Sequence, residues 1–105
     1  MIVRWLKTAR NNRFEQLDYI AADNPTAAAR VDEEIERQTD LLAQFPKMGR
    51  EGRVNGTREL VINRSPYIVV YRVKEDRIEI IRLLHVAQRW PKPATPKAPA
   101  SSSSS

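Results

Sequence analysis

Three short apolar runs in the second half of the chain constrain the fold most. They span residues 59–62, 67–73 and 78–86, and only a few residues separate one run from the next. All three are rich in β-branched and aromatic residues, which favour the pleated, half-buried surface of a sheet. Because breaks this short join neighbouring antiparallel strands, the pattern predicts a three-stranded antiparallel meander.

The third run contains polar residues at the positions where we expect a site. Alternation along a strand predicts two faces for it, with Ile81, Leu83 and His85 on one and Ile80, Arg82 and Leu84 on the other. Both faces are mostly apolar, so we expect this strand to be well covered, with its polar side chains at the edge of the covered area. Arginines recur through the whole meander, at Arg58, Arg64, Arg72, Arg82 and Arg89.

The first half of the chain predicts one strand and two helices. Residues 2–6 are short and apolar, as in a strand, and Thr8 is placed to cap a helix over about residues 9–22. Asn24 and Pro25 suit the N-cap and first position of a second helix, which ends near Phe45. Helical spacing predicts two core-facing stripes: Phe14, Leu17, Ile20 and Ala21 in the first helix, and Val31, Ile35, Gln38, Leu42 and Phe45 in the second.

Residues 46–56 predict a flexible basic loop, because they hold all three glycines of the chain together with Lys47, Arg50 and Arg53. Backbone amides beside glycine can approach a phosphate, although P-loop spacing is absent, and a plain connector is the alternative. The predicted element order is therefore β-α-α-β-β-β. The helical hairpin and the small antiparallel sheet each have an apolar side, so we expect an α+β fold of two layers.

The length of 105 residues allows one domain, which we place at residues 1–91. Residues 92–105 are rich in proline, alanine and serine, and such a tail is expected to be disordered. The formal net charge of +5 lies wholly in residues 57–105, which hold nine Lys and Arg against four Asp and Glu, whereas residues 1–56 hold nine of each. This asymmetry favours nucleic acid or an acidic protein as partner, and ordinary solubilising charge is the alternative.

Several classes of site are excluded by composition. The chain has no cysteine and one histidine, so disulfides, thiol nucleophiles and the usual zinc sites are ruled out, and we expect no metal or other cofactor. The N-terminus lacks the long apolar core of a signal peptide, and no apolar run approaches the ~20 residues of a membrane span. A cytoplasmic protein without membrane partners is expected.

Several segments together resemble one family. They are PKMGREGRV at residues 46–54, GTRELV at 56–61, PYIVVYRV at 66–73, and IEIIRLLH at 78–85 with AQRWP at 87–91. In this order and spacing they are similar to the RelE/ParE superfamily of toxins from bacterial type II toxin–antitoxin pairs, over roughly residues 2–91. The resemblance implies a RelE/ParE-like fold, with a helical hairpin packed on the sheet, and an antitoxin partner whose C-terminal segment wraps the toxin.

In the RelE branch, the resemblance implies cleavage of messenger RNA on the ribosome, by attack of a ribose 2′-hydroxyl on the adjacent phosphate. Such a reaction needs a proton donor and acceptor, and positive charge at the developing phosphorane. Histidine is the side chain suited to proton transfer near neutral pH, so His85 is the candidate acid/base. Arg64 and Arg82 are candidates for holding the phosphate.

The resemblance and the charge pattern also suggest residues that bind the partner: Arg50, Arg53, Arg58, Tyr71, Gln88 and Trp90. Tyr71 or Trp90 would stack on a base. Structural alternatives stay open for each candidate. His85 would be a hydrogen-bonded histidine at a strand end, and Arg64 and Arg82 would be solvated or paired with the antitoxin. Tyr71 would lie in the core and Trp90 would form a C-terminal lid.

Compared with RelE-type nucleases, the match of individual positions is partial. Arg64 resembles the arginine that those nucleases place at the end of this strand, and His85 resembles a late histidine of several relatives. A lysine pair that some use is replaced by Thr57 and Arg58. The closing tyrosine or second arginine is also missing, with Gln88 and Trp90 in that neighbourhood.

The ParE branch inhibits DNA gyrase by binding, without a nuclease site, and often ends its last strand in Leu-His, as residues 84–85 do. Three functions therefore follow as expectations. The favoured one is a toxin that stops growth by binding gyrase. The others are a ribosome-dependent endoribonuclease toxin and a small basic binding domain without toxicity.

Overall fold

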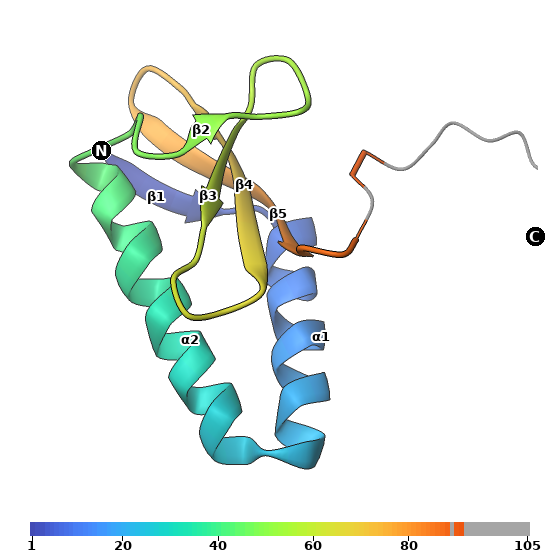
Figure 1. Ribbon diagram of the computed structural model, residues 1–105. Helices are drawn as coiled ribbons and strands as arrows, with labels where there is room; N and C mark the ends of the chain where they lie inside the picture. The colour runs from blue at the N-terminus through green and yellow to red at the C-terminus, as the bar shows by residue number, and fades with distance from the viewer. Residues whose placement is uncertain (89, 92–105) are drawn as a thin grey trace, which may run out of the picture.

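The predicted meander forms the centre of a five-stranded sheet in the computed structural model, which describes residues 1–88 and 90–91 (Figure 1). The elements are β1 (Ile2–Trp5), α1 (Lys7–Asp23), α2 (Pro25–Asp40), the 3₁₀ turn η1 (Leu41–Ala43), β2 (Arg50–Glu51), β3 (Arg58–Val61), β4 (Tyr67–Val73) and β5 (Arg77–His85). The two helices lie side by side on one face of the sheet, and their connecting turn projects beyond it (Figure 1). This confirms the two-layer α+β fold. Arg89 and the tail predicted to be disordered lie outside the described residues.

Two features of the sheet differ from the prediction. The strand order is β1-β5-β4-β3-β2, and β1 pairs with β5 in parallel, so the sheet is mixed rather than antiparallel. A parallel neighbour follows from the connection, because the helical hairpin returns the chain to the far edge of the sheet before the meander begins. The basic loop also contains a strand, since β2 pairs with β3 and lengthens the opposite edge.

The helix caps confirm one prediction and correct another. The Asn24 side chain accepts a hydrogen bond from the Ala27 amide at 3.1 Å, and Pro25 opens α2, as expected. Thr8 does not cap α1, which begins earlier, at Lys7. The reason is that Leu6 donates its amide to the Ile80 carbonyl while its own carbonyl accepts from Arg10, so strand pairing passes directly into the helix.

The prediction of which helix residues face the core was only partly correct. Ile20 and Val31 pack against the core and Ile35 and Leu42 are buried in it, but Phe14 is 71% exposed. Ala9 is the fully buried position of α1, and at about 100° per residue Phe14 is turned roughly 140° away from it. The prediction for the second stripe is wrong at its end, where Phe45 is exposed. The reason is that α2 ends at Asp40 and the following 3₁₀ turn has a different number of residues per turn.

The face assignment for β5 was correct for residues 82–85 but wrong for Ile80, because the strand contains a bulge. Val70 pairs with Arg82 but Tyr71 pairs with Ile80, which leaves Ile81 as an extra residue. As a result Ile80 and Leu83 both lie in the core beneath the helices, although strict alternation places them on opposite faces. Arg82 is thereby turned to the face away from the helices, which we call the open face.

Tyr71 holds the segment before β2 against the centre of the sheet. Its ring is 0% exposed, and its hydroxyl donates to the Pro46 carbonyl at 2.7 Å and accepts from the Gly49 amide at 2.9 Å. A Cβ at Gly49 would lie 2.8 Å from the Tyr71 ring, so glycine permits the close approach. Residues 46–49 are therefore fixed by a buried side chain rather than flexible.

Removal of this hydroxyl tests the role of Tyr71. Tyr71→Phe leaves a buried amide and a carbonyl without their partner, and we expect a loss of about 2 kcal/mol in the free energy of unfolding. Urea denaturation measures it, with Tyr19→Phe as the matched control because Tyr19 is 81% exposed. Equal unfolding midpoints for the two variants would show that the hydroxyl does not hold the loop.

Candidate functional site

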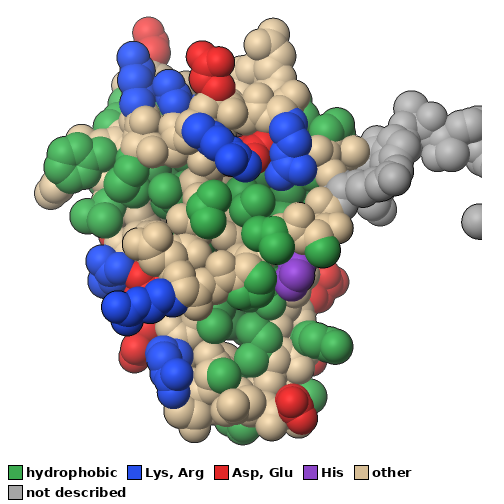
Figure 2. Space-filling model, viewed as in Figure 1, with side chains coloured by type: hydrophobic (Ala, Val, Ile, Leu, Met, Phe, Trp, Pro, Cys, Tyr) green, Lys and Arg blue, Asp and Glu red, His purple; other side chains and the backbone are tan. Residues whose placement is uncertain are grey.

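The open face of the sheet collects charged side chains from all five of its strands. The register places Arg50, Glu59, Val70 and Arg82 in one row across β2, β3, β4 and β5. Arg72 and Glu79 lie in a neighbouring row, with Arg4 of β1 beside Glu79. Figure 2 shows part of this pattern, an acidic side chain between basic ones near β2. The open face therefore combines arginines from both halves of the chain with two glutamates, whereas Arg64 of the second half lies beside α2.

Glu59 organises the basic loop. It is 1% exposed, and its carboxylate accepts hydrogen bonds from the Arg53 amide at 2.9 Å, from Arg53 Nε at 3.0 Å and from Arg50 Nη2 at 3.2 Å. Burial is the largest effect and raises the pKa of Glu59, but the hydrogen bonds from Arg53 and Arg50 together outweigh it and hold the pKa below the usual range. Arg50 and Arg53, predicted to bind a partner, thus also neutralise a buried acid.

A second cluster of the same kind joins β4 to β5. Glu79 accepts from Arg72 Nη2 at 3.1 Å and from Arg77 Nε at 3.0 Å. The hydrogen bond from Arg77 is the largest of the effects that lower the pKa of Glu79. Neither glutamate was predicted from the sequence as a site residue. The available signal was a carboxylate inside an apolar strand run, since such a group needs a cation when the strand is buried.

Arg82 and Trp90 meet on the open face. After β5 the chain turns, with the Gln88 amide donating to the His85 carbonyl at 2.8 Å, and this turn brings Trp90 back over the sheet. The guanidinium carbon of Arg82 lies 5.1 Å from the centroid of the Trp90 ring, within the ~6 Å reach of a cation–π contact. Gln88 serves the same turn, because its Oε1 accepts from the His85 amide at 3.3 Å.

His85 lies at the end of β5, where the sequence placed it, but on the other side of the strand from Arg82. Its ring meets the Tyr67 ring edge-on, with 5.7 Å between centroids. Its Nδ1 accepts the Ala87 amide at 3.1 Å, so Nε2 is the nitrogen that remains for an outside partner. These contacts agree with the alternative of a hydrogen-bonded histidine at a strand end.

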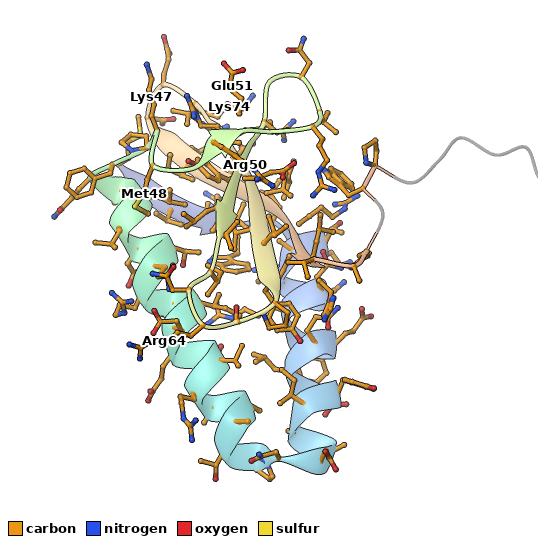
Figure 3. The ribbon with its side chains drawn as sticks, viewed as in Figure 1. Lys47, Met48, Arg50, Glu51, Arg64 and Lys74 are labelled. Atoms are coloured by element: carbon orange, nitrogen blue, oxygen red, sulfur yellow. The ribbon has the colours of Figure 1, made fainter. Side chains whose placement is uncertain are left out.

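Arg64 lies in a third location, at the turn between β3 and β4 and beside α2 (Figure 3). Arg58 donates to the Gly49 carbonyl and supports the chain before β2. Tyr71 is buried, which agrees with the core alternative and leaves no ring face for a base. The structure therefore brings Arg50 and Arg53 together at Glu59, and Arg82 together with Trp90, but gives Arg64, Arg82 and His85 separate neighbours. Their roles in catalysis or binding stay predictions.

Two further classes of site find no support in the described part of the chain. Across residues 1–88 and 90–91, no three His, Asp or Glu side chains are grouped so as to hold a metal ion. Neither helix there has the length and apolar content to cross a membrane.

The Glu59 cluster gives a testable dependence of stability on pH. The pKa of Glu59 in the folded protein is below the value of about 4.3 for an unfolded glutamate. The charged carboxylate therefore contributes its full amount to the unfolding free energy above that pH. This stabilisation is lost as the pH falls through the pKa that Glu59 has in the folded protein. We expect Glu59→Gln to lose about 2 kcal/mol of unfolding free energy at pH 7 and progressively less in acid.

Urea denaturation at several pH values between 3 and 7 measures the difference in unfolding free energy between the parent protein and Glu59→Gln. The control is Glu33→Gln, because Glu33 is exposed on α2. A deficit for Glu59→Gln that stays constant over the whole range would contradict the assignment of the charge as its source.

Comparison with known proteins places this geometry in a family. Residues 3–90 match the family described as the ParE toxin of the type II toxin–antitoxin system, parDE. The chain is 43% identical over 90 residues to protein Y4kP of Sinorhizobium fredii, named as a candidate toxin, covering 86% of this chain and 93% of that protein. It is 35% identical over 71 residues to Toxin RelE2 of Caulobacter vibrioides, covering 68% and 78%.

A solved structure agrees. The chain matches one from the chromosomal ParDE toxin–antitoxin system of P. aeruginosa with a TM-score of 0.73 and 26% identity, over 81% of this chain and 95% of that one. The fold predicted from the resemblance is thereby confirmed. The chain belongs to the ParE family of the RelE/ParE superfamily, the toxins of type II toxin–antitoxin systems.

Proposed function

We propose that this toxin stops bacterial growth by binding DNA gyrase, and that its antitoxin silences it by covering the basic open face. The observation that supports binding over cleavage is the separation of the candidate catalytic side chains. Arg64 lies beside α2, Arg82 contacts Trp90, and His85 contacts Tyr67. A binding mechanism requires complementary surfaces and no convergence of acid, base and phosphate-holding groups.

Cleavage of RNA makes a stricter demand on geometry. The base must reach the attacking hydroxyl within hydrogen-bond distance, and a cation must lie at the same phosphate. His85 Nδ1 is occupied by the Ala87 amide, and Arg82 is turned to the opposite side of β5. The two groups therefore do not share one phosphate-sized site in this conformation, which favours the gyrase proposal.

An acidic antitoxin suits the open face. Glu59 is paired with two arginines, so that cluster keeps one positive charge in excess, and Arg82 adds another. The Glu79 cluster is balanced, because Arg77 also pairs with Asp76. An anionic partner gains from this field without having to displace the internal pairs. The P. aeruginosa relative is described as part of a ParDE toxin–antitoxin system, which supports an antitoxin partner for this chain as well.

One observation favours a second candidate function. The identity to Toxin RelE2 of Caulobacter vibrioides supports the RelE-like alternative, a ribosome-dependent messenger RNA endonuclease. In that case the reaction would use His85 with Arg64 and Arg82 after a rearrangement on the ribosome. A non-toxic basic binding domain is the third candidate.

Induction of the chain alone in bacteria tests the proposal. We expect growth to stop, a DNA-damage response to appear, and co-expression of the cognate antitoxin to restore growth. In parallel, purified toxin should inhibit supercoiling by gyrase, and ribosome-bound messenger RNA should show no new 5′ ends. Normal growth after induction would remove both toxin candidates.

His85→Ala separates the two mechanisms. A catalytic acid or base contributes at least about a hundredfold in rate, so this variant would abolish RNA cleavage. Under the gyrase proposal the side chain is structural, and we expect gyrase inhibition to stay within a few-fold of the parent protein, with Glu33→Gln as the control. New RNA 5′ ends that disappear in His85→Ala would overturn the proposal in favour of cleavage.

A further inference from the structure

The side of α1 that is turned away from the core has no role in the function proposed above. It carries the Phe14 ring at its centre, and this ring is 71% exposed. At about 100° per residue, four other side chains of the helix lie within roughly 40° of Phe14 around the helix axis: Lys7, Arg10, Asp18 and Ala21. We call these five residues the outer stripe of α1. A large exposed aromatic ring in the middle of such a stripe is typical of a contact surface.

A groove lies beside Phe14 between the two helices. It has a volume of about 270 Å³, and small side chains dominate its apolar lining, with Ala21 from α1 and Ala28 and Ala29 from α2 beside Leu17. The surface therefore has a projecting ring and, next to it, a hollow that can receive a ring. This combination is what a surface needs in order to pack against a copy of itself, because a two-fold contact uses the same patch twice.

The charges of α1 are arranged against its own dipole. The first turn holds Lys7 and Arg10 and no acid, whereas the second half carries Asp18 and the last turn has no basic residue. Cations near the N-terminus of a helix and anions near its C-terminus are unfavourable for that helix alone. An antiparallel copy of α1 compensates this arrangement, because its acidic half then lies beside the basic half of the first helix.

The two charges that such a pairing needs are available. Arg10 and Asp18 are both exposed, and across residues 1–88 and 90–91 neither takes part in an ion pair. Arg13 is different, because it pairs with Asp32 of α2 at 2.6 Å and its guanidinium carbon lies 4.7 Å from the centroid of the Trp5 ring. The ion pair of Arg13 therefore holds the helical hairpin together, while the ends of the outer stripe still lack partners.

We propose that the outer stripe binds the outer stripe of a second copy of this chain, as a two-fold pair of antiparallel α1 helices. A two-fold axis at Phe14 sets residues that are equally far before and after it opposite each other. The two Phe14 rings then meet at the axis. Each Arg10 faces Asp18 of the second copy, since both lie four residues from Phe14, and the Lys7 stem covers Ala21 in the same way.

This pairing leaves the open face accessible. The helices lie on one side of the sheet and the open face on the other, so a pair formed through α1 presents two basic faces to its surroundings (Figure 1). The inference does not rest on the gyrase proposal, because self-association is measured on the purified chain without any target.

Sedimentation equilibrium of the purified chain between about 10 μM and 1 mM is the experiment. We expect the average mass to rise from that of a monomer toward that of a dimer in this range, because one helix from each copy makes a small interface. Higher salt should lower the association, since the Arg10–Asp18 pairs are exposed to solvent. A monomer at every concentration would overturn the proposal.

An exchange of charges identifies the surface. Arg10→Asp and Asp18→Arg should each weaken the association about tenfold, because one substitution sets like charges opposite each other at two places in a two-fold pair. The variant that carries both substitutions restores opposite charges, and we expect its association to return to within a few-fold of the parent protein. Failure of this double variant to recover would show that the two residues do not face each other.

Phe14→Ala separates association from folding. It should weaken the association about tenfold or more, as an aromatic residue at the centre of an interface does, while the thermal midpoint stays that of the parent protein because the ring is exposed. Tyr19→Ala is the matched control, since Tyr19 is 81% exposed and lies about 140° from Phe14 around α1. Equal losses in these two variants would contradict the proposal. Unchanged association of Phe14→Ala, with weaker binding of the antitoxin instead, would overturn it and assign the stripe to the antitoxin.

Discussion

The pairing of β4 with β5 is the contact on which the rest of the structure depends. These two central strands supply most of the core beneath the helices and also bury Ile68, Val70 and Leu84 on the open face. The bulge at Ile81 sets what each face presents. Without it, strict alternation from Ile80 would turn the Arg82 guanidinium into the apolar layer under the helices, where an unpaired charge is costly. The bulge keeps the apolar residues inside and delivers Arg82 to the open face.

The charge of the open face has a structural part and an available part. Glu59 binds the loop before β3 to the sheet through Arg50 and Arg53, and Glu79 links β4 to β5 through Arg72 and Arg77. Buried carboxylates of this kind require cations, so four arginines of a basic surface are committed to folding before any partner arrives. The number of arginines in a sequence therefore overstates the charge that a partner meets, although the sign of the field remains positive.

A toxin that works by binding and one that works by catalysis make different use of the same fold. Separate basic features are sufficient for binding, whereas cleavage needs His85 and an arginine at one phosphate. Here the histidine faces the helix side of β5, Arg82 faces the open side, and Arg64 stands at the α2 side of the β3–β4 turn. Each location offers a partner a distinct contact.

The sequence by itself determined the order of the elements apart from β2, the cap of α2 at Asn24, the limits of β4 and the basic character of the meander, because these follow from local periodicity and turn chemistry. It also contained the family resemblance. Only the tertiary structure decided that β1 joins β5 in parallel, that Phe14 is exposed, and that a bulge changes the faces of β5. It likewise decided which arginines are paired with buried glutamates. These outcomes depend on contacts between residues far apart in the chain, and local patterns do not encode such contacts.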